Sequence, residues 1–173
     1  MPNWYLGAGC IAQTVWNTLH GYEPDRNIED YDLAYFDSDD LSEKAEGRFI
    51  LRAQSILGDL GRVVDIKNEA RVHLWYKNHF GYAIRAYRSI EDAIGSWPTT
   101  ATSIGVRLEE NGSLTVFAPF GLSDLFSMIV RPNKKQVEYF LTRDQSTSRD
   151  VYNRKSEKWA RAWPRLVVLP WED

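Results

Sequence analysis

Cysteine is nearly absent from this 173-residue sequence, which excludes folds that depend on cross-links. Cys10 is the only cysteine, so no disulfide can form within the chain, and a reducing, intracellular environment is expected. The three histidines, His20, His73 and His79, are dispersed and cannot complete the usual four-ligand zinc set with it. Apolar burial must therefore hold the fold together, and 43% hydrophobic residues suffice for a packed core.

Long apolar runs are missing as well. No segment approaches the roughly 18 apolar residues that a membrane span requires. The first residues also lack the basic and apolar regions of a secretory signal. There is no internal repeat, low-complexity segment or linker, so the sequence predicts one soluble, cytoplasmic domain over residues 1–173, without a membrane partner.

Excess positive charge is also missing. The net charge of −3 argues against a strongly basic nucleic-acid-binding protein. Residues 131–173 nevertheless carry ten Lys and Arg against six Asp and Glu, whereas residues 1–130 carry eleven against eighteen. This division fits a site in which carboxylates hold metal ions and cations meet phosphates. It is equally explained by a solvent-exposed pair of C-terminal helices.

Apolar periodicity predicts strands and helices that alternate in the first half of the chain. Gly21 is well placed to end the first helix, and Asp40 with Glu43 predicts a capping box that opens the second. Such alternation is typical of an α/β or α+β domain. The expected elements are the strands 4–6, 31–36 and 62–67 and the helices 11–20, 40–57 and 69–80.

The second half begins with a short helix opened by Ser89 and Asp92. Asn111 and Gly112 then predict a hairpin turn between two strands. We expect helix over most of the remaining chain to Trp163, followed by a short apolar strand. The expected segments are the strands 103–108, 114–117 and 166–170 and a helix over 121–128.

Two aspartates on the second strand and one on the third are the strongest candidates for chemistry. Asp30 and Asp32 point to the same side of a strand, because strand side chains alternate. Two such carboxylates repel unless a cation lies between them, and Mg²⁺ prefers oxygen ligands. If the third strand lies beside the second, Asp65 completes a three-carboxylate cluster of the kind that holds two metal ions. Taken alone, the pair is better explained by a solvated strand end.

A glycine turn precedes the first helix and predicts a phosphate site. Gly9 lets the backbone approach phosphate oxygens, and the N-terminus of the following helix attracts negative charge. Ala12 stands where the dinucleotide-binding motif requires its third glycine, so that motif is incomplete. The order of glycine turn, helix, Asp-x-Asp, helix and Asp is more specific than any of its parts.

With these motifs in this order, the sequence resembles the DNA polymerase beta-like nucleotidyltransferase superfamily. It is most similar to small nucleotidyltransferase family proteins of uncharacterised substrate. The resemblance implies the nucleotidyltransferase fold, a mixed central sheet flanked by helices with a helical C-terminal part. It covers nearly the whole chain and is carried by residues 4–17, 30–37, 64–76, 97–102, 118–126 and 130–133.

The resemblance also implies roles for individual residues. Asp30 and Asp32 would bind Mg²⁺ or Mn²⁺, and Asp65 would share one metal ion and help to deprotonate the acceptor. Gly7, Gly9 and Cys10 would hold the triphosphate of an NTP; Cys10 stands where relatives often have Ser or Gly. A nucleoside monophosphate would pass to a hydroxyl-bearing acceptor, which could be a small molecule, a protein or RNA, and pyrophosphate would be released.

Further candidates have weaker support. Lys67, Arg71 and Arg131 could meet phosphate groups, although Lys67 and Arg71 also fit the surface of an amphipathic helix. Trp97 and Pro98 could line a nucleotide pocket or form a structural corner. An exposed edge of the first strand suggests a homo-oligomer. The alternative function is a catalytically silent nucleotide-binding or regulatory module of the same fold, for instance a partner in a toxin–antitoxin-like pair.

Overall fold

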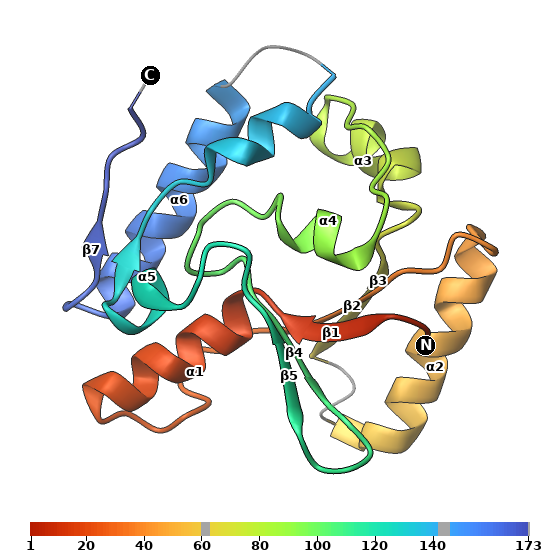
Figure 1. Ribbon diagram of the computed structural model, residues 1–173, viewed down its shortest axis with the longest axis horizontal. Helices are drawn as coiled ribbons and strands as arrows, with labels where there is room; N and C mark the ends of the chain where they lie inside the picture. Colours follow the sequence, from red (N-terminus) through yellow and green to blue (C-terminus); the bar gives the residue numbers. More distant parts are fainter. Residues whose placement is uncertain (60–62, 142–145, 173) are drawn as a thin grey trace.

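A five-stranded mixed sheet forms the centre of the molecule (Figure 1), as expected from the sequence. The computed structural model describes residues 1–59, 63–141 and 146–172. The elements are β1 (Trp4–Gly7), α1 (Gly9–His20), β2 (Tyr31–Tyr35), α2 (Glu43–Leu57), β3 (Val64–Asn68), α3 (Val72–Phe80), α4 (Ile90–Ile94), β4 (Gly105–Leu108), β5 (Leu114–Phe117), α5 (Ser123–Phe126), β6 (Ile129–Val130), the 3₁₀ helix η2 (Lys134–Tyr139), α6 (Ser146–Ala162) and β7 (Val167–Val168).

The strand order β3-β2-β1-β4-β5 places β1 in the middle of the sheet. β2 and β3 are parallel, and the other pairs are antiparallel. The expectation that the first strand has an exposed edge is therefore wrong, because β2 and β4, from later in the chain, pair with both of its edges. The argument for self-association that depended on this edge no longer holds.

The predicted ends of α1 and α4 are observed, but the N-cap of α2 is at a different residue from the one predicted. Gly21 ends α1 in the left-handed conformation at φ 71°, which glycine adopts without strain. Ser89 caps α4 by accepting a hydrogen bond from the Asp92 N–H. The N-cap of α2, however, is Ser42, whose hydroxyl accepts from the Ala45 N–H. Asp40 instead accepts hydrogen bonds from the backbone and hydroxyl of Ser42 and so holds the turn before the helix.

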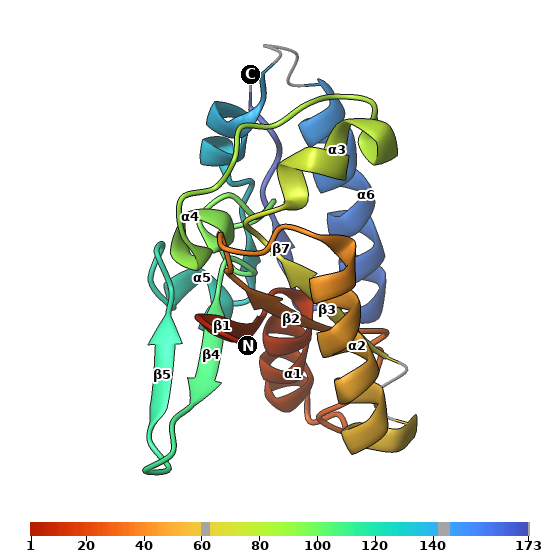
Figure 2. The same ribbon diagram turned by 90° about the vertical axis from the view of Figure 1, so that its right-hand side faces the viewer.

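Other boundaries differ because tertiary contacts override the local pattern. α3 begins at Val72, three residues after the predicted start, because residues 69–71 form a turn that closely follows β3. The predicted strand over 62–67 is observed as β3, and its first predicted residue lies outside the described residues. In the C-terminal part the expected continuous helix is interrupted by β6, which pairs in parallel with the tail strand β7. The predicted hairpin is present as β4 and β5, and it projects to one side of the molecule (Figure 2).

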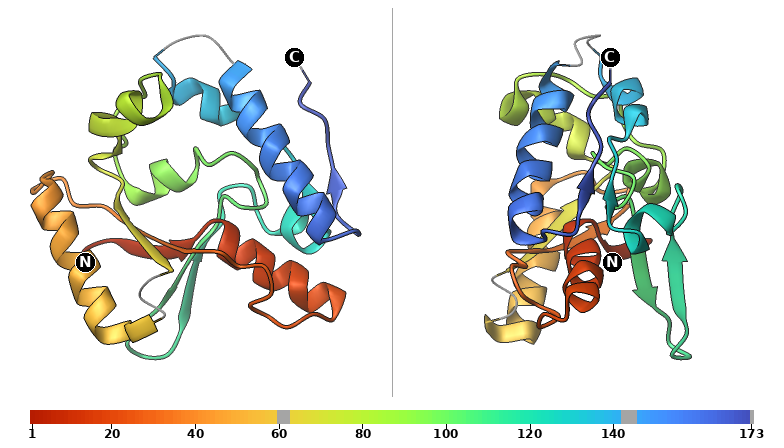
Figure 3. Two further views of the ribbon diagram at one scale, coloured as in Figure 1. Left: turned by 180° about the vertical axis from the view of Figure 1, so that it is seen from behind. Right: turned by 90° about the vertical axis from the view of Figure 1, so that its left-hand side faces the viewer.

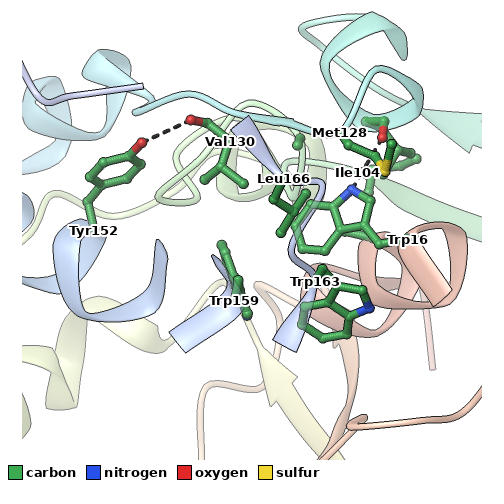
Figure 4. Close-up of a cluster of buried hydrophobic side chains, with 11 residues drawn as sticks. Trp16, Ile104, Met128, Val130, Tyr152, Trp159, Trp163 and Leu166 are labelled. Carbon is green, nitrogen blue, oxygen red and sulfur yellow. Dashed lines mark hydrogen bonds between the residues drawn. The ribbon is translucent and has the colours of Figure 1, made fainter. Parts of the chain in front are cut away.

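An aromatic core joins the first and last helices (Figure 4). The rings of Trp159 on α6 and of Trp163, the residue that follows α6, each lie edge-on to Trp16 on α1, with centroids 5.6 Å apart. The Trp163 indole N–H donates to the Asn17 side chain, and the Tyr152 hydroxyl donates to the Val130 carbonyl. Aromatic pairs of this kind contribute about 0.5–1.5 kcal/mol beyond their buried area. The core therefore fixes α6 against α1.

α6 crosses the molecule from the level of α3 to the level of α5 and β7 (Figures 1 and 3). Two of its lysines, Lys155 and Lys158, consequently line a cavity together with acidic residues of β2 and β3. Within the described residues, no helix has the length and apolar character needed to cross a bilayer.

Candidate active site

A cavity of about 340 Å³ collects residues from five segments of the chain. The start of α1 forms one wall, β2 and β3 form the floor, α6 forms a second wall, and the turn at Trp97 and Pro98 closes a third side. Asp30, Asp32 and Asp65 all line this cavity. The three predicted carboxylates thus line one cavity beside the glycine turn, and their clustering around a metal ion and their roles stay predictions.

Strand register explains how the aspartates meet. Asp32 on β2 is the direct partner of Asp65 on β3, and neighbouring strands lie roughly 4.8 Å apart. Side chains of paired residues leave the same face of a sheet, and Asp30 precedes Asp32 by two residues. Burial, together with the nearby charge of Asp30, raises the pKa of Asp32 to about 6, against the opposing effect of Lys155. A cation nearby would stabilise the ionised form of such a carboxylate.

A lysine already lies against the third carboxylate. Lys67 Nζ is 2.6 Å from Asp65 Oδ1, and both side chains are partly exposed. Within the part of the chain that the structure describes, no three His, Cys, Asp or Glu side chains are grouped as metal ligands. The donor chemistry fits Mg²⁺, since the cavity offers carboxylate oxygens with incompletely balanced charge. Lys67 thus competes with a metal ion for the Asp65 carboxylate.

The N-terminus of α1 faces the same cavity through Ala8 and Gly9. Ala8 has φ 56° and ψ −132°, a strained conformation for a residue with a side chain. In the described structure the helix has neither a side-chain cap nor an acidic residue in its first turn. Its first N–H groups lack helical partners, and they form the kind of site that binds anions. The buried Gln13 Oε1, which also lacks a hydrogen-bond partner among the described residues, adds a polar group to this wall.

α6 contributes two cations to the cavity that the sequence did not identify individually. Lys155 and Lys158 line it together with Trp159. Lys155 lies close enough to counteract the rise in the pKa of Asp32, and Lys158 Nζ is 2.5 Å from Glu29 Oε2. The basic composition of residues 131–173 was the only sequence signal for these lysines. The charge division therefore brings basic and acidic residues to one cavity, and the interpretation that its cations meet phosphates and its carboxylates hold metal ions stays a prediction.

Glu69 is a third residue of the cavity that sequence analysis missed. It follows β3, is buried and lines the cavity. Burial, together with the charges of Asp32 and Glu46, raises the pKa of Glu69 to about 8. A mainly protonated carboxyl group beside Asp32 can donate a hydrogen bond at neutral pH. The sequence indicated its place in the cavity only through its position four residues after Asp65, where the chain leaves the strand.

Four predicted nucleotide-binding residues do not line the cavity. Gly7 is needed for packing, because a Cβ there would lie 2.6 Å from the Ile104 carbonyl oxygen and 2.8 Å from the Trp97 ring. The Cys10 thiol is buried and donates to the Gly7 carbonyl, and burial raises its pKa to about 11.

The two arginines among these four are paired elsewhere. Arg71 is buried and bound to Glu46 at 2.8 Å. Arg131 lies 2.9 Å from Asp124. Of the predicted nucleotide-binding residues, the cavity thus contains Gly9 and Lys67. Trp97 and Pro98 both line the cavity and form a corner, since Asn133 donates to the Trp97 carbonyl.

Comparison with known proteins supports the resemblance read from the sequence. A family model described as "Nucleotidyltransferase" matches residues 1–168. A solved structure, described as an NMR structure that reveals a CCA-adding enzyme head domain, shares the fold with a TM-score of 0.76. It is 23% identical in sequence, and the match covers 99% of this chain and 83% of the other. No curated protein matches the chain.

Proposed function

Because the chain belongs to the nucleotidyltransferase family, we propose that it transfers a nucleoside monophosphate from an NTP to a hydroxyl-bearing acceptor and releases pyrophosphate. One observation carries the proposal: the register pair Asp32 and Asp65 shares a cavity with Asp30 and the N-terminus of a helix. Carboxylates for metal ions and N–H groups for phosphate are the two requirements of this reaction.

Different residues of the cavity bind the triphosphate, hold the metal ions and exclude water. The N-terminus of α1, Lys155 and Lys158 bind the triphosphate by charge and hydrogen bonds. Mg²⁺ or Mn²⁺ held by Asp30 and Asp32, and shared by Asp65, would neutralise the charge that develops on the transferred phosphoryl group. Trp97 and Trp159 border the cavity and limit the access of water.

The covalent step is an exchange at the α-phosphorus. The acceptor oxygen forms a bond to this phosphorus, the bond to the bridging oxygen of the β-phosphate breaks, and pyrophosphate leaves with the bonding electrons. Asp65 takes the proton of the acceptor hydroxyl, which it can do once Lys67 has moved away from it. Lys67 then faces the triphosphate as a further cation.

The Lys67–Asp65 ion pair also supports a second candidate function. If Lys67 remains in place, it substitutes for a metal ion at Asp65 and the protein binds nucleotides without transferring them. The chain would then act as a silent or regulatory module, for instance within a toxin–antitoxin-like pair.

Pyrophosphate release separates these two functions. The protein is incubated with each of the four labelled NTPs, Mg²⁺ or Mn²⁺ and a cell lysate as the source of acceptors, and pyrophosphate and transferred label are measured. Asp32→Asn should lower the rate by about 100-fold or more, since metal-assisted charge stabilisation accounts for several kcal/mol. Asp25→Asn, the same change at an exposed position outside the cavity, is the control. Nucleotide binding without any release, with either metal, would favour the silent module.

A further inference from the structure

A second hollow lies on the other side of the Asp65–Lys67 pair. It is an open groove of about 710 Å³ between β3, the start of α2 and the helix α3. Asp65 and Lys67 line both the groove and the cavity described above. Figure 1 shows β3 between α2 and α3, at the edge of the sheet. A molecule in the groove therefore reaches the carboxylate that faces the nucleotide cavity.

One wall of the groove is aromatic. Trp75, His79 and Phe80 line it from α3. The ring of His79 lies edge-on to Phe80 at 4.5 Å and to Trp75 at 6.0 Å. Phe80 is 45% exposed, so burial in the core does not account for its position. Exposed rings of this kind bind flat or apolar ring faces, and they attract cations.

The opposite wall is acidic. Glu43 and Glu46 line it from α2, and Asp65 is the third carboxylate of the groove. Among the described lining residues these three face two cations, and both cations are already paired, Lys67 with Asp65 and Arg71 with Glu46. Glu43 shares Arg71 at 3.5 Å while its side chain is 88% exposed. The lining of the groove thus has one carboxylate more than it has cations, and the lysines of α6 that line the cavity, Lys155 and Lys158, are not part of it.

We propose that this groove is the acceptor site and that it takes a small, hydroxyl-bearing ring compound that is neutral or cationic. This inference rests on the proposed nucleotidyl transfer. Excess carboxylate charge disfavours a polyanionic acceptor such as RNA. The aromatic wall holds the ring, and Glu43 attracts a positive substituent. The hydroxyl is thereby presented to Asp65 from the side opposite the triphosphate.

Three phenols whose short para substituents differ in charge test the groove. Tyramine is cationic, tyrosol is neutral and 4-hydroxyphenylacetate is anionic, and each carries the same hydroxyl-bearing ring. Binding is measured from the NMR shift of the Trp75 indole N–H, assigned with Trp75→Phe. Tyramine and tyrosol should bind at least threefold more tightly than 4-hydroxyphenylacetate. Saturating ATP should not displace them.

Two variants assign the binding to the two walls. Phe80→Ala should weaken tyramine binding about fivefold, the range of ring and cation–ring contacts. Its control is Phe126→Ala, which removes a similarly exposed ring outside the groove. Glu43→Gln, at a position too exposed to affect folding, should remove the preference for tyramine over tyrosol.

Parallel binding of a fluorescent ATP analogue, mant-ATP, separates this inference from the proposed function. If mant-ATP binds but the phenols do not, or if a single-stranded RNA oligonucleotide binds the groove more tightly than tyramine, the acceptor assignment is overturned. It is equally overturned if the anionic phenol binds best or if ATP displaces tyramine. Phenol binding without mant-ATP binding would instead contradict nucleotidyl transfer and, with it, the acceptor role.

Discussion

The cavity and the groove share Asp65 and Lys67, yet the other residues that line them differ in kind. The cavity combines carboxylates with the N-terminus of α1 and the lysines of α6. The groove combines carboxylates with exposed rings of α3. Trp159 on α6 and Trp163 just after it are buried in the core, whereas the ring of Phe80 on α3 is exposed. The comparison shows that aromatic residues stabilise one side of the molecule and remain available for binding on the other.

Removing one tryptophan from the core and one from the groove should show the largest difference between these two regions. Trp163 is 1% exposed and belongs to the core, so Trp163→Ala should lower the free energy of unfolding by about 3–5 kcal/mol. Trp75→Ala in the groove should lower it by less than about 1 kcal/mol. Urea unfolding measures both. Equal losses would mean that Trp75 is structural and that the α3 wall is not a binding surface.

Two glycines test whether the turn at the cavity serves packing or binding. Gly7→Ala should destabilise the protein by about 1–3 kcal/mol, because the new Cβ overlaps the Ile104 carbonyl and the Trp97 ring. A methyl group at Gly47 in α2 would meet no other segment of the described chain within 4 Å, so Gly47→Ala should stabilise the helix by about 0.5–1 kcal/mol. Thermal unfolding provides the measurement. A stable Gly7→Ala protein with impaired nucleotide binding would restore the predicted phosphate role of Gly7.

Charge reversal on α6 should affect the cavity alone. Lys155→Glu should weaken mant-ATP binding by about tenfold or more, because it replaces a cation beside the triphosphate with a carboxylate. Tyramine binding in the groove should not weaken. The neighbouring Arg154 is exposed and does not line the cavity, so Arg154→Glu serves as the matched control. A similar loss in both variants would indicate a general charge effect rather than a direct contact.

Metal binding should have the smallest effect on stability. Mn²⁺ at ten times its dissociation constant should stabilise the protein by about 1.4 kcal/mol, because it binds only the folded state. Asp32→Asn should abolish this gain and, without metal, should make the protein about 1 kcal/mol more stable, because it removes a crowded, partly buried charge. Differential scanning fluorimetry with Mn²⁺ and with EDTA tests both effects. Unchanged stabilisation in Asp32→Asn would place the metal elsewhere.

Several features of the fold could be predicted because their causes are local. Gly21, Ser89 and the Asn111-Gly112 turn each act on the few residues around them. The Asp30-x-Asp32 spacing fixes a common side for these two residues. The fold class and family followed from the order of such motifs, and the family match and the shared fold confirm them. The local pattern misplaced the cap of α2, because Asp40 and Ser42 are both good caps and only the path of the chain selects between them.

The amino-acid sequence by itself determined most elements of the first half of the chain, which aspartates are expected to face the same way and which part of the chain is basic, because each depends on neighbours a few residues apart. Only the tertiary structure decided that β1 is central, that α6 brings Lys155 to Asp32, and that Arg71 is buried against Glu46. Those outcomes depend on which distant segments bury their apolar faces together. That choice minimises the exposed apolar surface of the whole chain, and no short stretch of sequence contains it.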